Sequence, residues 1–438
     1  MSSVPSPRPL LPLLPLLLLL ASPAPAGGAP ATLVRLASAP ADLGAMCLDG
    51  SAPALYVREA SPGNPWIVAI DGGGWCYNES SCYDRSLTPL GSSDSWPAQR
   101  DGLGIESDNC TANPVFCAFN VALIPYCDGM SFMGSRSDPI VFAPNASFSA
   151  SLFARGVNIL DATLNFLVRN TSFARAPQVI VDGCSAGAYN SLQHLDRVAA
   201  ALPPAADVRG VADAGVFVDA ATVTGDFYYR SLLQYYFPMH NASAGAHPDC
   251  LASRPAGAAW QCGIVTTAGK CPQPNPPANP AAATHQCPVH KPRAVPFLRH
   301  PVFAIQSAFD SYQLGNVFAP VWLPGVDASW AACANSAAAC SAEQTNALLY
   351  SWLPAMKGGL AAAGLLGPGP GTPRGPHGLF LHSCFTHCQW GEMHQIFVGG
   401  VSMYDAFVAF ATGASGYDPN STAYQHVDCA STQCNPTC

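Results

Sequence analysis

The segment Gln178–Asn190 reads QVIVDGCSAGAYN and decides the fold class of this chain. Its apolar run Val179–Val181 predicts the end of a buried strand, and the residues after it predict a helix. Between the two, GCSAG fits the pattern G-x-S-x-G, which places a serine on a tight strand-to-helix turn because glycines let the strand and the helix approach closely. We therefore expect Ser185 to be an exposed nucleophile. The alternative is a plain turn between a strand and a helix.

The sequence around this segment alternates predicted strands with predicted helices. Apolar runs bounded by turn residues begin at Trp66, Val121, Val302 and Gly378. Apolar residues three and four positions apart predict a helix within 153–170, and 191–202 and 401–413 predict two more. This alternation favours the α/β class, with a mainly parallel sheet and helices on both faces. Together with the serine turn it predicts an α/β-hydrolase-like fold with loop insertions and disulfides.

Residues 1–26 predict a cleaved signal peptide. Arg8 precedes a leucine-rich run at 10–20, and Ala24, Pro25 and Ala26 supply the small-residue pattern that signal peptidase accepts. The run is shorter than the ~20 apolar residues that span a bilayer. No later stretch predicts a membrane helix. We therefore expect a secreted, extracellular protein without stable membrane insertion; a retained signal anchor is the alternative.

Two proline-rich stretches interrupt the alternation of strands and helices. They lie near 271–288 and 365–378, and their content of proline and polar residues predicts surface insertions. No internal repeat divides the remainder of the chain. We therefore expect residues 27–438 to form one domain.

The composition narrows the classes of partner. Charged residues make up 11% of the 438 residues and the net charge is −8, which argues against a nucleic-acid partner because such partners require a basic face. In a secreted chain, 18 cysteines predict disulfides rather than thiol sites. Six Asn-x-Ser/Thr sequons predict N-glycosylation. They are Asn78, Asn109, Asn145, Asn170, Asn241 and Asn420.

A serine nucleophile requires a base, and the base requires an acid that orients it. In α/β-hydrolases the acid and then the histidine follow the serine along the chain. Asp310 and His387 each come just after a predicted strand, where active-site residues gather in open α/β sheets. We therefore expect Asp310 and His387 to complete the site, and His382 to be a packed or exposed strand residue. The competing acids are Asp182, Asp213 and Asp219.

The segment DGGGWC, at 71–76, follows an early predicted strand. Acyl transfer requires main-chain N–H groups that face the oxyanion, and these come from the residue after the nucleophile and from such a glycine-rich loop. Gly73, Gly74, Trp75 and Ala186 are therefore the candidate donors. The alternative is a flexible glycine turn.

The segment HSCFTHC, at 382–388, contains two histidines and two cysteines and thus raises the question of a zinc site. Its C-x3-C spacing is not the usual zinc spacing, and a secreted chain oxidises such cysteines. We expect no metal and no organic cofactor. The cysteines are instead expected to brace the loop around His387.

Several of these segments together resemble the pectin acetylesterases and, more distantly, the Notum carboxylesterases. In chain order, from about Leu43 to Cys438, they are DGGGWC, IPYCDGMSFMG, DGCSAGAYNSL, GVADAGVFVD, AIQSAFDSYQ, HSCFTHCQ and the C-terminal CNPTC. Cys184 is the pectin acetylesterase form of this position, where Notum-like sequences carry serine. The resemblance therefore favours the plant and algal type of pectin acetylesterase.

The resemblance implies a carboxylic ester hydrolase that removes O-acetyl groups from an acetylated cell-wall polysaccharide, pectin, through an acyl-enzyme. It implies Ser185 as nucleophile, His387 as general base and Asp310 as its orienting acid. The implied oxyanion donors are the N–H groups of Gly74, Trp75 and Ala186.

Two alternatives remain open. One is a Notum-like lipid deacylase, which requires an apolar tunnel for a long acyl chain. The other is a non-catalytic protein that binds wall glycans on the same fold. Pectin is polyanionic whereas this chain is acidic, so Arg85 and Arg136 are the candidate cations for contact with pectin.

Overall fold

The computed structural model describes residues 29–263, 266–267, 295–367, 377–413, 424–428, 431–432 and 434–438. The predicted signal peptide at 1–26, the predicted insertion near 271–288 and the sequon at Asn420 lie outside the described residues.

A ten-stranded sheet runs through the molecule in the order β16-β13-β12-β9-β8-β3-β5-β2-β1-β4. In chain order its strands are β1 (Ala31–Arg35), β2 (Ala54–Arg58), β3 (Trp66–Ile70), β4 (Gln99–Arg100), β5 (Asn120–Ile124), β8 (Gln178–Gly183), β9 (Asp207–Asp213), β12 (Val302–Ser307), β13 (Gly378–His382) and β16 (Gln425–Val427). All pairs from β5 to β16 are parallel. The expected mainly parallel sheet is therefore confirmed.

The other edge of the sheet is antiparallel, which the sequence did not predict. Strand β1 pairs antiparallel with β2 and with β4, and β2 pairs antiparallel with β5. Strands β1 and β2 have only five residues each and both end in arginine. Such short, partly polar strands carry a weak pattern, because an edge strand buries less of its surface than a central one.

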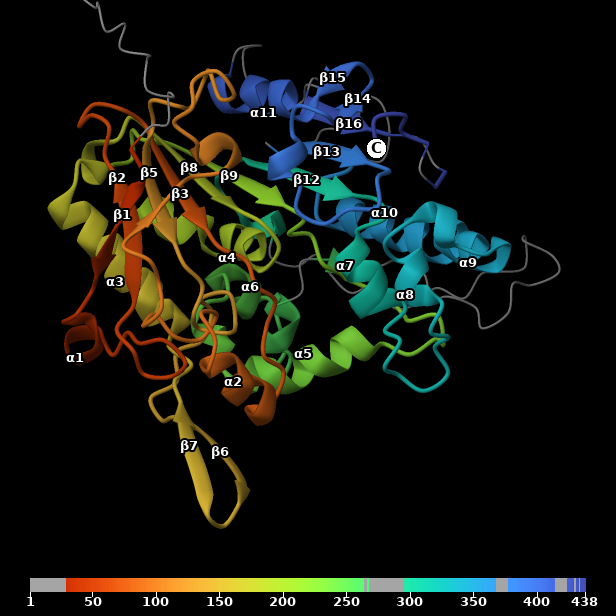
Figure 1. The fold of residues 1–438 in the computed structure, drawn as a ribbon, viewed down its shortest axis with the longest axis horizontal. Helices are drawn as coiled ribbons and strands as arrows, with labels where there is room; N and C mark the ends of the chain where they lie inside the picture. The colour runs from red at the N-terminus through yellow and green to blue at the C-terminus, as the bar shows by residue number, and fades with distance from the viewer. Residues whose placement is uncertain are drawn as a thin grey trace, which may run out of the picture.

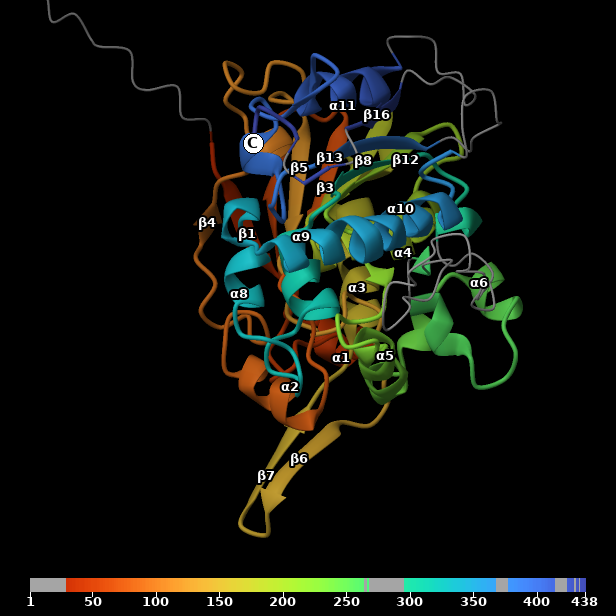
Figure 2. The same ribbon diagram turned by 90° about the vertical axis from the view of Figure 1, so that its right-hand side faces the viewer.

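Side chains of β3 alternate between two hydrophobic cores, as those of a strand covered on both faces must. Trp66 and Val68 belong to the core that also contains apolar residues of α3 (Gly156–Asn170) and α4 (Ala186–Ala200). Ile67 belongs to the core that contains apolar residues of α11 (Met403–Thr412). Figures 1 and 2 show α3 and α4 on one face of the sheet and α11 on the other. The three helices expected from the sequence are thus present.

The remaining helices lie in the segments that connect the strands. They are α1 (Ala39–Leu43), α2 (Glu79–Ser86), α5 (Tyr228–Met239), α6 (Pro248–Ala252), α7 (Ser311–Gln313), α8 (Trp330–Cys333), α9 (Ala342–Ala347) and α10 (Leu353–Ala362). Most of them lie in loops between strands, where the sequence shows no clear period. Among the described residues, no helix is both long enough and apolar enough to cross a membrane.

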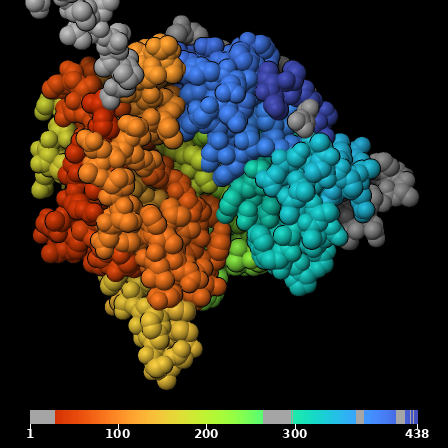
Figure 3. All heavy atoms as spheres, viewed as in Figure 1, coloured from red at the N-terminus to blue at the C-terminus, as the bar shows by residue number. Residues whose placement is uncertain are grey.

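A two-stranded hairpin of β6 (Ile140–Asn145) and β7 (Phe148–Leu152) stands clear of the body of the molecule (Figures 1 and 3). Asn145 lies at its tip and is exposed. All five sequon asparagines in the described residues are exposed, which makes each of them sterically accessible.

The second predicted insertion requires a correction at both ends. Leu365 is fully buried and belongs to the main hydrophobic core, and Gly378 is the first residue of β13. The predicted boundaries 365–378 therefore extend into packed structure, because glycine and proline at the ends of the segment hid its apolar flanks. Residues 368–376 between them lie outside the described part of the chain.

Fourteen of the described cysteines form seven disulfides, as expected of the predicted class. The pairs are Cys47–Cys127, Cys76–Cys82, Cys110–Cys117, Cys184–Cys388, Cys250–Cys262, Cys333–Cys340 and Cys384–Cys438.

Candidate active site

Ser185 occupies the turn between β8 and α4. Its backbone has φ 57° and ψ −124°, a strained combination for a residue with a side chain. The turn is tight because Gly187 packs against the end of β3, where an added Cβ would lie 2.0 Å from the Ile70 carbonyl oxygen. Only glycine fits there. The serine side chain is thus held above the carboxyl end of the sheet, as the G-x-S-x-G pattern predicts.

Three side chains from separate loops form a hydrogen-bonded chain at this turn. The Ser185 Oγ lies 2.8 Å from His387 Nε2, and His387 Nδ1 lies 2.9 Å and 3.0 Å from the two carboxylate oxygens of Asp310. An ionised carboxylate only accepts hydrogen bonds, so Nδ1 carries the imidazole proton. Nε2 is then left to accept a proton from the serine hydroxyl.

Asp310 is held rigidly for this contact. It is fully buried at the start of α7, just past the end of β12. The main-chain N–H of Gln313 and the side-chain amide of Gln306 both donate to its carboxylate, at 2.9 Å and 3.1 Å. These donors compensate the charge of a buried carboxylate and fix its orientation.

The charged groups around His387 favour its protonated form, the imidazolium. Burial alone lowers the pKa of His387, but the charge and hydrogen bond of Asp310, with a further contribution from Asp213, raise it above its ordinary value. Tyr312 stacks on the imidazole, with ring centroids 5.1 Å apart. No sequence pattern predicted this contact of Tyr312, because the stacking depends on a loop conformation.

The glycine loop after β3 passes directly beside the serine, where an added Cβ on Gly72 would lie 3.2 Å from Ser185 Cβ. Three carbonyl groups of this loop accept hydrogen bonds from side chains. The Arg85 guanidinium donates to the Gly73 and Trp75 carbonyls at 2.7 Å and 3.3 Å, and the Tyr126 hydroxyl donates to the Gly74 carbonyl at 2.7 Å.

The anchored carbonyl groups determine where the N–H groups of this loop point. A trans peptide directs its N–H opposite to its carbonyl, so the N–H groups of Gly74 and Trp75 point away from Tyr126 and Arg85. Within the described part of the chain, the N–H groups of Gly74, Trp75 and Ala186 have no acceptor. Gly74 has φ +64°, a conformation in which glycine is favoured.

Ser131 joins the glycine loop to the serine turn. It accepts from Trp75 Nε1 at 2.8 Å and donates to the Ala186 carbonyl at 2.7 Å. Arg85, Tyr126 and Ser131 thus fix the conformation of the glycine loop. The sequence did not predict this role for any of the three. Arg85 was expected to contact a polyanion, but the structure places its guanidinium among loop carbonyls.

The competing acids each have another role. Asp213 accepts from the main-chain N–H groups of Gln389 and Trp390, at 2.5 Å and 3.1 Å, and so fixes the segment that follows His387. Asp182 accepts from Trp390 Nε1 at 3.0 Å. Asp219 pairs with Arg230 at 2.8 Å.

The other candidate ligands of the segment 382–388 have structural roles. His382 is buried in β13, and burial lowers its pKa to about 4, as fits a packed strand histidine. The two cysteines of the segment 382–388 are both in disulfides, so neither is available as a thiolate ligand.

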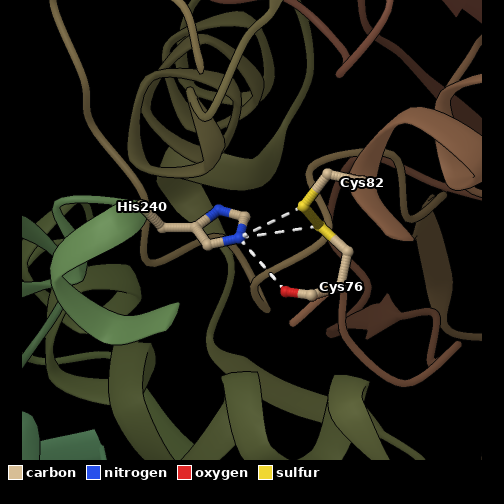
Figure 4. Close-up of side chains that lie close together, drawn as sticks. All are labelled: Cys76, Cys82 and His240. Atoms are coloured by element: carbon tan, nitrogen blue, oxygen red, sulfur yellow. Dashed lines mark hydrogen bonds between the residues drawn. A yellow bond between two sulfur atoms is a disulfide. The ribbon is translucent and has the colours of Figure 1, made fainter. Parts of the chain in front are cut away.

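A group of Cys76, Cys82 and His240 is the one cluster of metal-ligand types found in the described residues (Figure 4). The two sulfur atoms are bonded to each other, so they cannot serve as thiolate ligands. His240 Nε2 lies 3.6 Å and 3.7 Å from them and 3.4 Å from the Cys76 carbonyl oxygen. Burial lowers the pKa of His240 to about 4, so the ring is neutral and braces the glycine loop after Trp75.

Two neighbouring cavities share Tyr312, the residue that stacks on His387. The larger, of about 430 Å³, is bordered by His387, and the smaller, of about 170 Å³, is bordered by Tyr77. Tyr312, Asn316 and Trp322 line both. On the face shown in Figure 3, the segments that follow β3, β12 and β13 meet, so loops far apart in the sequence enclose this site.

Known proteins share sequence similarity with nearly the whole of this chain. A family model described as pectinacetylesterase matches residues 28–438. Pectin acetylesterase 7 of Arabidopsis thaliana is 32% identical over 416 residues, which cover 94% of this chain and 93% of that protein. The palmitoleoyl-protein carboxylesterase NOTUM of Homo sapiens is 34% identical over 181 residues, covering 40% of this chain and 34% of that protein.

A solved structure shares the fold. The Wnt deacylase Notum from Drosophila aligns with a TM-score of 0.68 and 22% sequence identity, covering 93% of this chain and 99% of that one. This similarity confirms the α/β-hydrolase-like fold.

Proposed function

Because the chain belongs to the pectinacetylesterase family and is a carboxylic ester hydrolase, we propose that it is a secreted serine esterase that removes O-acetyl groups from cell-wall polysaccharide, with pectin as the substrate. The observation that carries the proposal is the hydrogen-bonded chain Ser185–His387–Asp310 beside main-chain N–H groups that have no acceptor among the described residues. Residues 27–438 form the esterase domain in this proposal.

The first half-reaction forms an acyl-enzyme. Ser185 Oγ attacks the ester carbonyl carbon while His387 Nε2 takes the hydroxyl proton. The resulting imidazolium is stabilised by the carboxylate of Asp310. The oxyanion accepts hydrogen bonds from the N–H groups of Gly74, Trp75 and Ala186, and each such donor is worth ~3 kcal/mol of barrier.

The first half-reaction ends when this tetrahedral intermediate collapses: His387 gives its proton to the departing sugar oxygen, and the acetyl group remains on Ser185. The second half-reaction releases acetate. Water then attacks the acetyl carbon while His387 Nε2 takes one of its protons, and the serine leaves with that proton. These steps use only side chains and main-chain groups of this protein.

A short acyl group fits the surroundings of the serine better than a long one. Trp75 packs against Phe217 with ring centroids 4.8 Å apart, and Phe217 lies 6.4 Å from the His387 ring. Both rings are buried and closely packed, and in this proposal they limit the depth of the acyl pocket. The acetyl ester is thus preferred over the long-chain ester of the Notum alternative.

The decisive experiment measures acetate released from acetylated pectin by the purified protein and by Ser185→Ala. Loss of release in the variant, with an unchanged circular dichroism spectrum, supports the proposal. Release that persists in the variant contradicts the serine mechanism. A parallel series of 4-nitrophenyl esters from acetate to decanoate tests the acyl length, and we expect the highest kcat/KM with acetate.

Secretion and glycosylation are tested together. The predicted signal peptide at 1–26 and five exposed sequon asparagines support both. Expression of the full chain in a glycosylating host should deliver protein to the medium whose electrophoretic mobility increases after treatment with a glycosidase. Substitution Asn145→Gln at the hairpin tip should remove one glycan, and retention of the protein inside the cell contradicts this part of the proposal.

A further inference from the structure

The cavity beside His387 is on the side of the site that receives the leaving group. His387 Nε2 returns its proton to the departing oxygen, so the sugar that carries the acetyl ester must lie next to His387. The larger cavity includes His387 among its lining residues, whereas the smaller one does not. The larger cavity is thus the place for this sugar.

An aromatic platform lies at the rim of this cavity. The Trp322 side chain is 55% exposed, and its indole Nε1 donates to the Tyr228 hydroxyl at 3.3 Å, which fixes the ring. A fixed indole at the rim of a cavity offers a flat apolar face on which a sugar ring can stack. Asn316 and Asn335 supply amide groups in the same cavity.

Among the described residues that line this cavity there is no lysine, arginine, aspartate or glutamate. Two acidic residues lie on segments next to the cavity, and the nearby Arg230 is paired with Asp219 at 2.8 Å. Asp327 is exposed five positions after Trp322, and Asp226 is exposed on the turn whose Val223 N–H donates to the Phe318 carbonyl at 2.8 Å.

The two arginines predicted to contact pectin do not line this cavity, and both donate hydrogen bonds to main-chain carbonyl groups. Arg85 donates to carbonyls of the glycine loop, and Arg136 donates to the carbonyls of Met239 and Asp138, at 2.9 Å and 3.1 Å. Carboxylate recognition in proteins relies on such guanidinium groups. A free sugar carboxylate in this cavity would be desolvated without a partner and repelled by nearby acids.

We propose that this cavity binds an uncharged sugar residue, stacked on Trp322, and that the enzyme therefore deacetylates methyl-esterified galacturonate in preference to the free acid. The proposal rests on the proposed function and narrows its substrate. A galacturonate residue therefore binds in this cavity more tightly when its carboxyl group is methyl-esterified than when it is a free carboxylate. The smaller cavity shares Tyr312 with the larger one, and we assign it to the next sugar residue of the polymer.

The first test compares two acetylated pectins of equal acetyl content, one methyl-esterified and the other demethylated by a pectin methylesterase. At low ionic strength we expect the wild-type kcat/KM for acetate release to be about tenfold higher on the methyl-esterified polymer, with a smaller ratio in high salt. Equal or faster hydrolysis of the demethylated polymer overturns the inference.

The second test uses variants at the rim. Trp322→Ala should lose about tenfold more kcat/KM on the methyl-esterified polymer than on 4-nitrophenyl acetate, and Trp322→Phe should retain most of it. Tyr350→Ala, at an aromatic residue that is 77% exposed and lines neither cavity, serves as the matched control. Equal losses of Trp322→Ala on both substrates overturn the assignment of the platform.

A gain of function completes the design. Asn335→Arg places a cation in the cavity and should raise activity on the demethylated polymer relative to the methyl-esterified one. An unchanged ratio in a folded Asn335→Arg protein counts against the cavity as the sugar site. Failure of the proposed function is recognised separately, because the wild type would then release no acetate from either polymer.

Discussion

Cys184 and Cys388 form a disulfide between the residue before the serine and the residue after the histidine of the candidate site. The bond spans 204 positions of sequence and joins the β8–α4 turn to the loop after β13. Both cysteines are partly exposed. Cys388 has φ +67°, a conformation that non-glycine residues rarely adopt, so the loop is held in a form that requires support. The disulfide therefore fixes the distance between His387 and Ser185.

Removing this disulfide should reduce turnover more than it reduces substrate binding. We expect the double variant Cys184→Ser/Cys388→Ser to lose about 10- to 100-fold in kcat, because a misplacement of about 1 Å in a catalytic group costs up to ~100-fold. KM should change little. The measurement is steady-state hydrolysis of 4-nitrophenyl acetate, well below the unfolding temperature of the variant.

A matched control separates positioning from stability. Cys110→Ser/Cys117→Ser removes a disulfide that closes a loop of only seven positions. It should leave kcat within about twofold of the wild type, since neither cysteine contacts the site. A Cys184/Cys388 double variant with full kcat would show that Asp213 and the surrounding packing hold His387 without the bond.

The pH dependence of activity should report His387. A general base must be neutral, and its pKa is raised above its ordinary value by Asp310 and Asp213 against the effect of burial. Activity should therefore fall as the pH falls, with the midpoint of the acid limb above ~6.5, the ordinary value for histidine.

The variant Asp310→Asn tests the cause of this shift. Loss of the carboxylate charge should move the acid limb of kcat/KM to lower pH and reduce kcat by ~100-fold or more. The measurement is the pH–rate profile on 4-nitrophenyl acetate between pH 4.5 and 9. A midpoint that stays unchanged in the variant would exclude His387 as the titrating group.

The parts of this site that the sequence predicted are those governed by local pattern. Ser185 was identified because its glycines and flanking strand and helix are contiguous, and Asp310 and His387 because each follows a buried strand. The support from Arg85 and Tyr126 was not predicted, since it depends on where distant loops meet the carbonyls of Gly73–Trp75.

The same distinction applies to the fold. Central strands such as β3 and β8 are buried on both faces and read as continuous apolar runs, so their predicted positions agree with the structure. The hairpin of β6 and β7 is largely exposed and was not predicted, because only Ile140 and Leu152 at its base are buried and the remainder shows no regular apolar alternation. The pairing of Cys184 with Cys388 also required three-dimensional information.

The stability of the fold should decrease as the pH rises above 6.5. Four buried carboxyl groups have raised pKa values, chiefly because burial disfavours their charged form. For Glu106, Asp128 and Asp213 the pKa is raised to about 7, and that of Asp182 is raised as well. Above their unfolded pKa these groups hold more protons in the folded state, so their contribution to stability is lost as pH rises through the folded pKa.

Below pH 6.5 buried histidines oppose this trend. Burial lowers the pKa of four of them, to about 3 for His194 and to about 4 for His240, His377 and His382. Their contribution is lost as pH falls through that range, and above pH 6.5 they are neutral in both states. The free energy of unfolding should thus be nearly level between pH 5 and 6.5 and then fall.

Urea unfolding at pH 5.5, 6.5 and 8.0 measures this dependence. Each carboxyl group that stays protonated in the folded state contributes a decrease of about 1.4 kcal/mol per pH unit. Asp213→Asn should make the decrease smaller, since an amide does not ionise. A free energy of unfolding that increases from pH 6.5 to 8.0 would contradict the proposed balance of buried carboxyl groups and histidines.

Arg85 should matter equally for every ester. Its guanidinium orients the N–H groups of the glycine loop through the carbonyls of Gly73 and Trp75 and makes a cation–π contact with Tyr126 at 5.6 Å from the ring centroid. Arg85→Ala should therefore reduce kcat by about 10- to 100-fold, within the range expected when oxyanion stabilisation is impaired. The fractional loss should be the same on 4-nitrophenyl acetate and on acetylated pectin, with little change in KM.

Arg136→Ala is the control for this prediction, since that guanidinium binds carbonyls away from the glycine loop. It should retain kcat on both substrates. Arg85→Lys distinguishes charge from geometry, because the guanidinium holds the two N–H groups of its Nη2 in a fixed plane toward the two carbonyls, whereas an ammonium rotates freely. We expect it to resemble Arg85→Ala rather than the wild type. A loss confined to the polyanionic polymer would instead mean that Arg85 contacts the substrate, and that the glycine loop keeps its conformation without it.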